Sequence, residues 1–110
     1  MATEKDLEDF DQGSKYQLVI DVTGLDLTGY SARGMVRPDR VSSTVLADWA
    51  SYLSVNAVAK QVVLSIPADI MAGYNFDRGR YDIEVFKVGD VASPVRIMQG
   101  NVKLDREVTR

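Results

Sequence analysis

The sequence predicts an all-β protein, folded as an antiparallel β-sandwich of about seven strands with one short helical turn before the penultimate strand. Apolar and polar residues alternate with a period of two from residue 14 onward, which is the period of a strand with one buried face. Turn-forming residues interrupt this alternation roughly every 8–12 residues, as in sandwiches. The length of 110 residues suits one domain, and we assign residues 14–110 to it.

Composition excludes several kinds of catalytic and metal site. The chain has no cysteine and no histidine, so disulfides, thiolate metal sites and the commonest general base are excluded. Its carboxylates lack the spacing of a calcium loop, and neither a phosphate-binding loop nor a serine-nucleophile elbow is found. We therefore expect no enzyme, no cofactor and no small-molecule substrate.

Charge and hydropathy argue against a nucleic-acid partner, a membrane span and a secretory signal. The net charge of −3 is mild, whereas a surface that binds nucleic acid is basic, so a nucleic-acid partner is not expected. No apolar run approaches the ~20 residues of a membrane span. The acidic N-terminus has no apolar stretch of the kind found in secretory signals. These features predict a protein made in a reducing cytosol and used there or incorporated later into a particle.

Residues 1–13 differ from the rest and are predicted to form an acidic N-terminal arm. Five acidic residues accompany a single lysine there. Besides Met1, the large apolar side chains of this arm are Leu7 and Phe10. The arm is either a frayed terminus or a segment whose Leu7 and Phe10 dock on a neighbouring subunit.

The first two strands are predicted in residues 15–22 and 26–37, separated by a break at Thr23-Gly24 and ended by Pro38. The inward face of the second strand includes Gly34, where glycine costs about 0.5–1 kcal/mol relative to alanine. We expect Trp49, the only tryptophan, to pack across from Gly34. The alternative is a bulge at Gly34.

The middle of the chain is ambiguous between two periods. It could form a helix over Val45 to Leu53 or two short strands around a turn, and we favour the strands. A clear strand follows at residues 61–66 and ends at Pro67. Proline at a helix start and Gly73 near its end then predict a single helical turn.

The last two strands are predicted in residues 80–88 and 94–108. In the final strand the apolar phase changes, because Val95 and Ile97 are odd-numbered whereas Val102 and Leu104 are even-numbered. A slip of one residue would turn half of the strand inside out. We expect a β-bulge near Gly100 to absorb the slip.

A short motif at the start of the penultimate strand predicts an immunoglobulin-like sandwich. In such folds a tyrosine at this corner sends its hydroxyl to backbone a few residues upstream. We assign this corner to Asp77, Gly79 and Tyr81, with glycine allowing a tight turn and aspartate capping nearby amides. The competing interpretation, a metal or acid–base pair of Asp77 and Asp82, lacks a histidine or a third carboxylate nearby.

Arg33, Arg37 and Arg40 form a modest basic cluster near one strand end. Such a cluster is usually a solvated face or the rim of an interface, and contact with single-stranded nucleic acid is a weaker possibility. As an interface, the cluster would suit an acidic partner, for instance the acidic arm of a neighbouring copy.

Three stretches, LDLTGYSARGMVR, VVLSIPADIMAGYNFDRGRYDIEVF and RIMQGNVKLDREVTR, together resemble a family of small immunoglobulin-like structural proteins of tailed bacteriophages. The family is similar to the N-terminal domain of the baseplate upper protein, and the resemblance covers roughly Ser14 to Arg110. It implies a virion structural protein without catalysis that binds other virion proteins and copies of itself. Because a fibre or receptor-binding region follows the sandwich in several relatives and this chain stops at Arg110, we expect an adaptor of the tail, baseplate or neck.

Two alternatives remain beside the adaptor. The first is a capsid decoration (cement) protein on the outside of the head. A carbohydrate-binding β-sandwich module would need exposed coplanar aromatic rings, for which the candidates are Trp49, Tyr52 and Tyr74.

Overall fold

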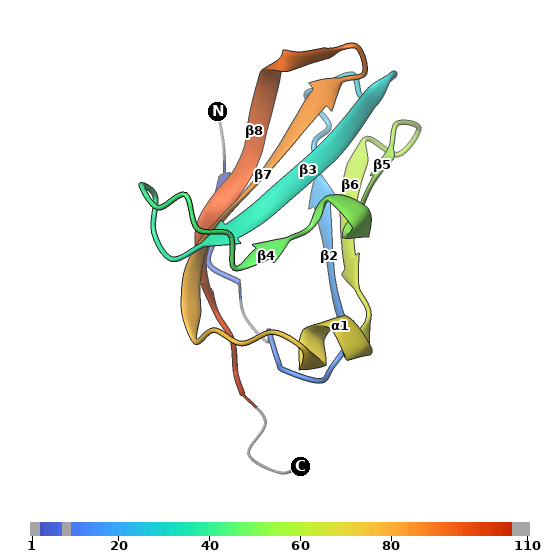
Figure 1. Ribbon diagram of the computed structural model, residues 1–110. Helices are drawn as coiled ribbons and strands as arrows, with labels where there is room; N and C mark the ends of the chain where they lie inside the picture. The colour runs from blue at the N-terminus through green and yellow to red at the C-terminus, as the bar shows by residue number, and fades with distance from the viewer. Residues whose placement is uncertain (1–2, 8–9, 107–110) are drawn as a thin grey trace.

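The computed structural model describes residues 3–7 and 10–106. Within this part the chain is mostly β and forms two sheets, which confirms the all-β prediction (Figure 1). Residues 1–2 and 8–9 of the predicted arm lie outside the described residues. Residues 107–110, which end the third stretch that resembles the phage family, also lie outside them.

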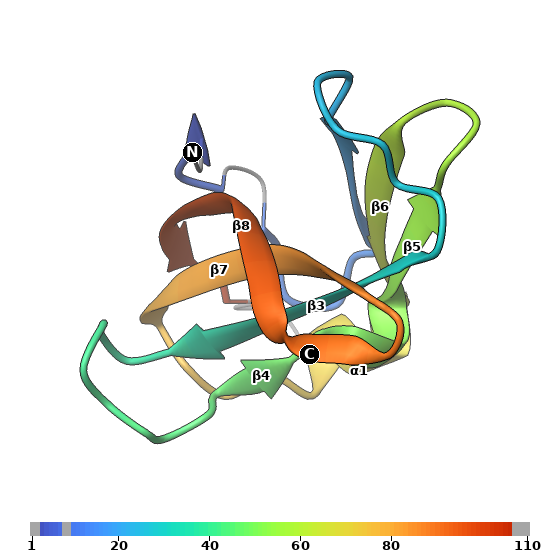
Figure 2. The ribbon, with the colours of Figure 1, turned by 90° about the horizontal axis from the view of Figure 1, so that it is seen from above.

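The larger sheet has five strands and the smaller has three (Figures 1 and 2). The order in the larger sheet is β1 (Thr3–Glu4), β8 (Asp90–Lys103), β7 (Arg78–Lys87), β3 (Tyr30–Arg37) and β4 (Ala47–Asp48). The order in the smaller sheet is β2 (Tyr16–Asp21), β6 (Gln61–Ile66) and β5 (Leu53–Asn56). A 3₁₀ turn (Ala50–Tyr52) and the short helix α1 (Ala68–Ala72) complete the described elements. All strand pairs are antiparallel except β1 with β8.

Strict alternation places one face of each long strand in the core. In β6 and in β7 every second residue is buried, as the sequence pattern predicts for half-buried strands. The larger sheet thereby contributes Tyr81, Ile83 and Val85, and the smaller sheet contributes Val62 and Leu64. These side chains belong to one hydrophobic core.

The middle of the chain crosses from one sheet to the other. It forms the two short strands β4 and β5 around a 3₁₀ turn, so the strand interpretation is confirmed and a helix over residues 45–53 is not found. Trp49 anchors the crossing: its amide donates to the Gly34 carbonyl (2.9 Å), and its own carbonyl accepts from the Tyr52 amide (2.9 Å). Its side chain is fully buried.

Trp49 lies across from Gly34 in the backbone, as expected, because its amide donates to the Gly34 carbonyl. Its side chain, however, does not supply the atoms nearest to the position of a Cβ at Gly34. A Cβ at Gly34 would lie 2.8 Å from the Asp82 carbonyl oxygen, 3.2 Å from Ile83 Cγ1 and 3.3 Å from Leu53 Cδ1, and these are its nearest atoms. Gly34 also pairs in register with Ile83, so it marks no bulge. Glycine is needed because backbone and apolar side chains approach this position closely.

The predicted slip in the last strand exists, but Gly100 is not the residue that absorbs it. The register of β7 and β8 shifts after the pair of Ile83 and Met98, and Glu84 then pairs with Arg96. The skipped residue is Ile97, and both Ile97 and Met98 are buried. This bulge changes the phase three positions before Gly100, which itself pairs in register with Tyr81.

The N-terminal segment is part of the fold, which corrects both interpretations of the arm. Leu7 and Phe10 are buried in the core of their own chain, so they are neither frayed nor available to a neighbouring subunit. The segment runs parallel to β8, where the amides of Lys5 and Leu7 donate to the carbonyls of Gln99 and Asn101. Beyond the end of β8, the Gln12 amide donates to the Asp105 carbonyl. Phe10 lies against Tyr16, with ring centroids 4.9 Å apart. The physical reason is that the exposed edge of β8 offers backbone partners while the open end of the core accepts the two apolar side chains.

Candidate functional site: the arginine face

The outward side chains of β3, β7 and β8 form one continuous face of the larger sheet. Strand pairing arranges them in rows across the sheet, which are Arg37–Arg80–Asn101, Met35–Asp82–Gln99 and Arg33–Glu84–Arg96. We call these nine residues the arginine face. They point outward because the alternate residues of the same strands are buried in the core.

Arg33 is neutralised on this face. Its Nε lies 2.5 Å from Glu84 Oε1, and its guanidinium lies 5.0 Å from the centre of the Phe86 ring. The ion pair and the cation–π contact together hold Arg33 against the sheet.

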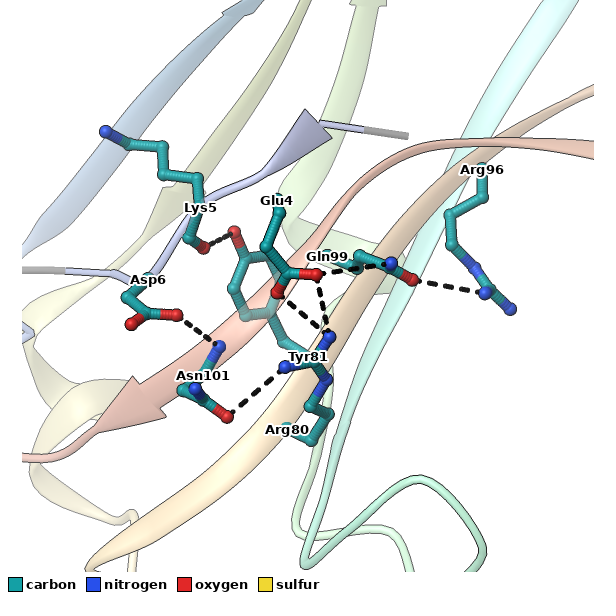
Figure 3. Close-up of polar contacts among 8 residues, drawn as sticks. All are labelled: Glu4, Lys5, Asp6, Arg80, Tyr81, Arg96, Gln99 and Asn101. Atoms are coloured by element: carbon teal, nitrogen blue, oxygen red, sulfur yellow. Dashed lines mark hydrogen bonds and ion pairs between the residues drawn. The ribbon is translucent and has the colours of Figure 1, made fainter. Parts of the chain in front are cut away.

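Arg80 and Arg96 are also paired, as Figure 3 shows for the contacts of Arg80. Arg80 Nη2 lies 2.9 Å from Glu4 Oε2, and Arg80 Nη1 donates to Asn101 Oδ1 at 3.4 Å. Arg96 lies 3.7 Å from Asp82 and donates to Gln99 Oε1 at 3.2 Å. The acidic N-terminal segment therefore supplies a carboxylate to one arginine of its own chain, Arg80.

Arg37 differs from its neighbours because no carboxylate pairs with it among the described residues. It stands directly opposite Arg80 in the strand register, and like charges in that position repel each other. Among the described residues, its Nη2 donates a hydrogen bond to the Met35 sulfur alone, at 3.5 Å, and a thioether is a weak acceptor. Its Nε is enclosed and has no hydrogen-bond acceptor within the described part of the chain. A buried unsatisfied donor costs about 1–3 kcal/mol, more when the group is charged.

A hollow of about 240 Å³ opens beside Arg37. Four arginines line it, Arg37, Arg40, Arg80 and Arg96, with two carboxylates, Asp39 and Asp82. Arg40 reaches the hollow from the loop after β3, where Asp39 Oδ1 accepts the amides of Val41 (2.9 Å) and Ser42 (2.8 Å). The excess of guanidinium groups gives this hollow a positive charge in a protein whose net charge is −3.

The structure brings together part of the basic cluster found in the sequence. Arg37 and Arg40 share the hollow, whereas Arg33 lines an adjoining one of about 310 Å³. Arg80 and Arg96 belong to the same face, and the sequence analysis missed both. The alternation in β7 places Arg80 outward, but only the strand register shows that it stands opposite Arg37.

Asp77, Gly79 and Tyr81 do not form the predicted corner. Gly79 lies inside β7, where a Cβ would be 2.6 Å from Val36 Cγ1, so it permits close packing and not a turn. The Asp77 carboxylate pairs with Arg106 at 3.1 Å and caps no amide among the described contacts.

The Tyr81 hydroxyl donates to the carbonyl of Lys5, on the N-terminal segment, and not to backbone a few residues upstream (Figure 3). Burial raises the pKa of this hydroxyl, and nearby Tyr16 adds to the effect. Tyr81 therefore links β7 to the N-terminal segment. Its side chain passes Gly100, the residue of β8 that lies between them. A Cβ at Gly100 would lie 2.1 Å from the Lys5 carbonyl oxygen, so glycine is required for this contact.

The aromatic residues considered for sugar binding do not offer an exposed platform. Trp49 is fully buried, and its Nε1 donates to the Tyr74 hydroxyl at 3.2 Å. Tyr52 and Tyr74 are partly buried against the core. The stacking surface that a carbohydrate module requires is therefore not formed by these three rings.

Among the described residues, no three or more aspartate and glutamate side chains gather in a group that could hold a metal ion. None of the helices in this part of the chain is long and apolar enough to span a bilayer.

A scan against protein-family models and a search of curated protein sequences found no match to this chain.

Proposed function

We propose that this protein is a non-enzymatic structural subunit that binds a partner protein through the arginine face. The observation that carries the proposal is Arg37, a charged side chain held in the wall of a positive hollow without a carboxylate of its own among the described residues. A carboxylate of a partner that entered the hollow would neutralise the charge of the Arg37 guanidinium and relieve its repulsion with Arg80.

The chemistry of the hollow favours a protein partner with acidic side chains. Guanidinium groups bind carboxylates through paired hydrogen bonds and are enriched in protein interfaces. Strands β3, β7 and β8 hold the backbone of the face in place, so binding would have to order arginine side chains but not the sheet beneath them. Neighbouring carboxylates at Asp39 and Asp82 would set the position of an acidic group, since they repel it from the rest of the hollow.

The fold and the family resemblance together favour a role in a virus particle. The strand order supports an immunoglobulin-like sandwich: β2–β6–β5 follows the B–E–D order of one sheet of that fold, and β8–β7–β3 follows the G–F–C order of its other sheet. We therefore propose an adaptor of the tail, baseplate or neck of a tailed bacteriophage, in contact with other virion proteins and copies of itself. Such particles repeat their subunits symmetrically, which suits a small rigid module with charged faces.

A binding titration with an acidic probe tests the proposed face. A short oligoglutamate peptide is added to the ¹⁵N-labelled protein at low salt, and amide shifts are followed by NMR. We expect shifts centred on Arg37, Arg40 and Arg96. Because an exposed ion pair is worth about 0.2–1 kcal/mol, Arg37→Gln with Arg40→Gln should weaken binding by about fivefold.

Lys60→Gln with Lys87→Gln is the matched control, since it also removes two positive charges, both from exposed residues outside the arginine face. Equal weakening by this control, or shifts spread over the whole surface, would show that only net charge matters and would contradict the proposed site. The virion role is tested separately, by mass spectrometry of purified heads and tails. The protein in tails supports the adaptor, the protein in heads supports the decoration protein, and its absence from particles overturns both.

A further inference from the structure

We infer that β2 carries a second interface, through which two copies of this chain join their smaller sheets as antiparallel neighbours. This interface lies on the other sheet from the arginine face and does not depend on the function proposed for that face.

The outer edge of β2 is open. In the described part of the chain β2 pairs with β6 on one side and with no strand on the other (Figure 2). The Val22 amide donates to the Lys60 carbonyl at 2.9 Å, which directs the backbone groups of the even-numbered residues toward β6. Because these groups alternate along a strand, those of Gln17, Val19 and Asp21 point to the open edge.

A groove runs along this edge. It has a volume of about 660 Å³ and lies between residues 18–25 on one side and residues 95–98 on the other, with Thr3 and Lys5 also in its wall. An added strand beside β2 would therefore enter a preformed depression. Val19 is half exposed at its rim, with 50% of its surface accessible.

The side chains of the edge select a second copy of β2 as its partner. Two antiparallel copies related by a two-fold axis at Leu18 would place Lys15 opposite Asp21 of the second copy, and Asp21 opposite Lys15 of the second copy. Both residues are exposed and odd-numbered, so the opposed pairs would lie on one face of the joined sheet. The edge is therefore complementary to itself in charge.

The same register also satisfies the backbone. It brings Gln17 opposite Val19 of the second copy, and both residues direct their backbone groups outward, as a hydrogen-bonded antiparallel pair requires. A two-fold axis at Gln17 or at Val19 would still pair residues whose backbone groups face outward. It would no longer place Lys15 opposite Asp21 of the second copy. The pairing of Lys15 with Asp21 and the backbone hydrogen bonds of Gln17 and Val19 therefore favour the same register.

A single strand pair buries less surface than a typical stable interface of about 1,600 Å². We therefore expect a weak dimer, with a dissociation constant of roughly 10–1,000 µM, that repetition in an assembly would reinforce.

Sedimentation equilibrium from about 10 µM to 1 mM tests the inference, with Val19→Pro as the first variant. Proline at an outward-facing amide of an edge strand leaves the ladder with β6 intact but blocks the added strand. We expect a concentration-dependent dimer for the wild type and a monomer for Val19→Pro with an unchanged circular dichroism spectrum. A wild type that stays monomeric to 1 mM, or a folded Val19→Pro that dimerises equally well, overturns the inference.

Charge reversal tests the register even if Val19→Pro fails to fold. Lys15→Asp and Asp21→Lys each place like charges together and should weaken the dimer about three- to tenfold, whereas the double variant should restore it. Lys103→Asp, on the other sheet, is the control and should leave the dimer unchanged. Failure of the double variant to recover, or equal weakening by the control, contradicts the proposed register.

Discussion

Substitution of Gly100 by alanine tests whether the N-terminal segment is part of the fold. The added Cβ would lie 2.1 Å from the Lys5 carbonyl oxygen, 2.6 Å from the Lys5 carbonyl carbon and 3.2 Å from the Asp6 amide nitrogen. All three are backbone atoms, so no side-chain rotation can relieve the overlap. The segment must move away from β8.

The cost follows from the contacts that this movement breaks. Displacement of Lys5 removes the bond of its amide to the Gln99 carbonyl (2.8 Å) and the bond that its carbonyl accepts from the Tyr81 hydroxyl. It also strains the bond from the Leu7 amide to the Asn101 carbonyl (2.9 Å). At about 1 kcal/mol for each bond, the loss is about 3 kcal/mol. Alanine regains about 0.5–1 kcal/mol from its better strand conformation, so we expect a net destabilisation of about 2 kcal/mol.

Urea denaturation followed by Trp49 fluorescence measures this change, because the single tryptophan is fully buried in the core. A loss of 2 kcal/mol should lower the midpoint by roughly 1 M urea. Gly24→Ala is the matched control: a Cβ there meets no atom within 4 Å, so we expect a change of less than about 0.5 kcal/mol. If Gly100→Ala is as stable as the wild type, the N-terminal segment does not pack on β8 as described.

Two further substitutions test the same region. Phe10→Ala removes a ring that is 1% exposed and 6.0 Å from the Trp49 ring, so it should cost about 3–5 kcal/mol; a change below 1 kcal/mol in urea denaturation would show that Phe10 is not in the core. Tyr81→Phe leaves the Lys5 carbonyl without its donor and should cost about 1–2 kcal/mol at pH 7. Burial raises the pKa of Tyr81 above its ordinary value of 10.0. The contribution of the neutral hydroxyl to the free energy of unfolding is therefore complete below pH 10 and is lost as the pH rises from 10 through the folded-state pKa. Denaturation between pH 8 and 11 should therefore show a steeper loss above pH 10 for the wild type than for Tyr81→Phe, and parallel curves would refute this role of the hydroxyl.

The strands that could be predicted are those whose signal is local. In residues 61–66 and 80–88 the apolar side chains recur at every second position, and β6 and β7 follow that pattern. The phase change between Ile97 and Val102 likewise required a bulge somewhere in the last strand. Its position could not be read, because Ile97 and Met98 are both apolar and only the pairing with β7 shows which residue is skipped.

The misplaced residues are those whose roles depend on distant partners. Leu7 and Phe10 lie in an acidic stretch that has the composition of a free terminus, yet they fill the core because the edge of β8 is available to their backbone. Tyr81 was expected to find its hydrogen-bond acceptor nearby, but its partner Lys5 is 76 residues away. Gly100 allows the Lys5 backbone to approach Tyr81 closely, and it takes no part in the bulge.

The sequence by itself determined the all-β class, the inward faces of the long strands and the absence of thiol and imidazole chemistry, because periodicity and composition are properties of neighbouring residues or of the whole chain. The tertiary structure alone decided which strands lie side by side. That pairing sets Arg37 opposite Arg80, gives Arg80 the carboxylate of Glu4 and leaves Arg37 without one among the described residues. Such arrangements depend on the strand register, which arises from contacts between residues far apart in the chain.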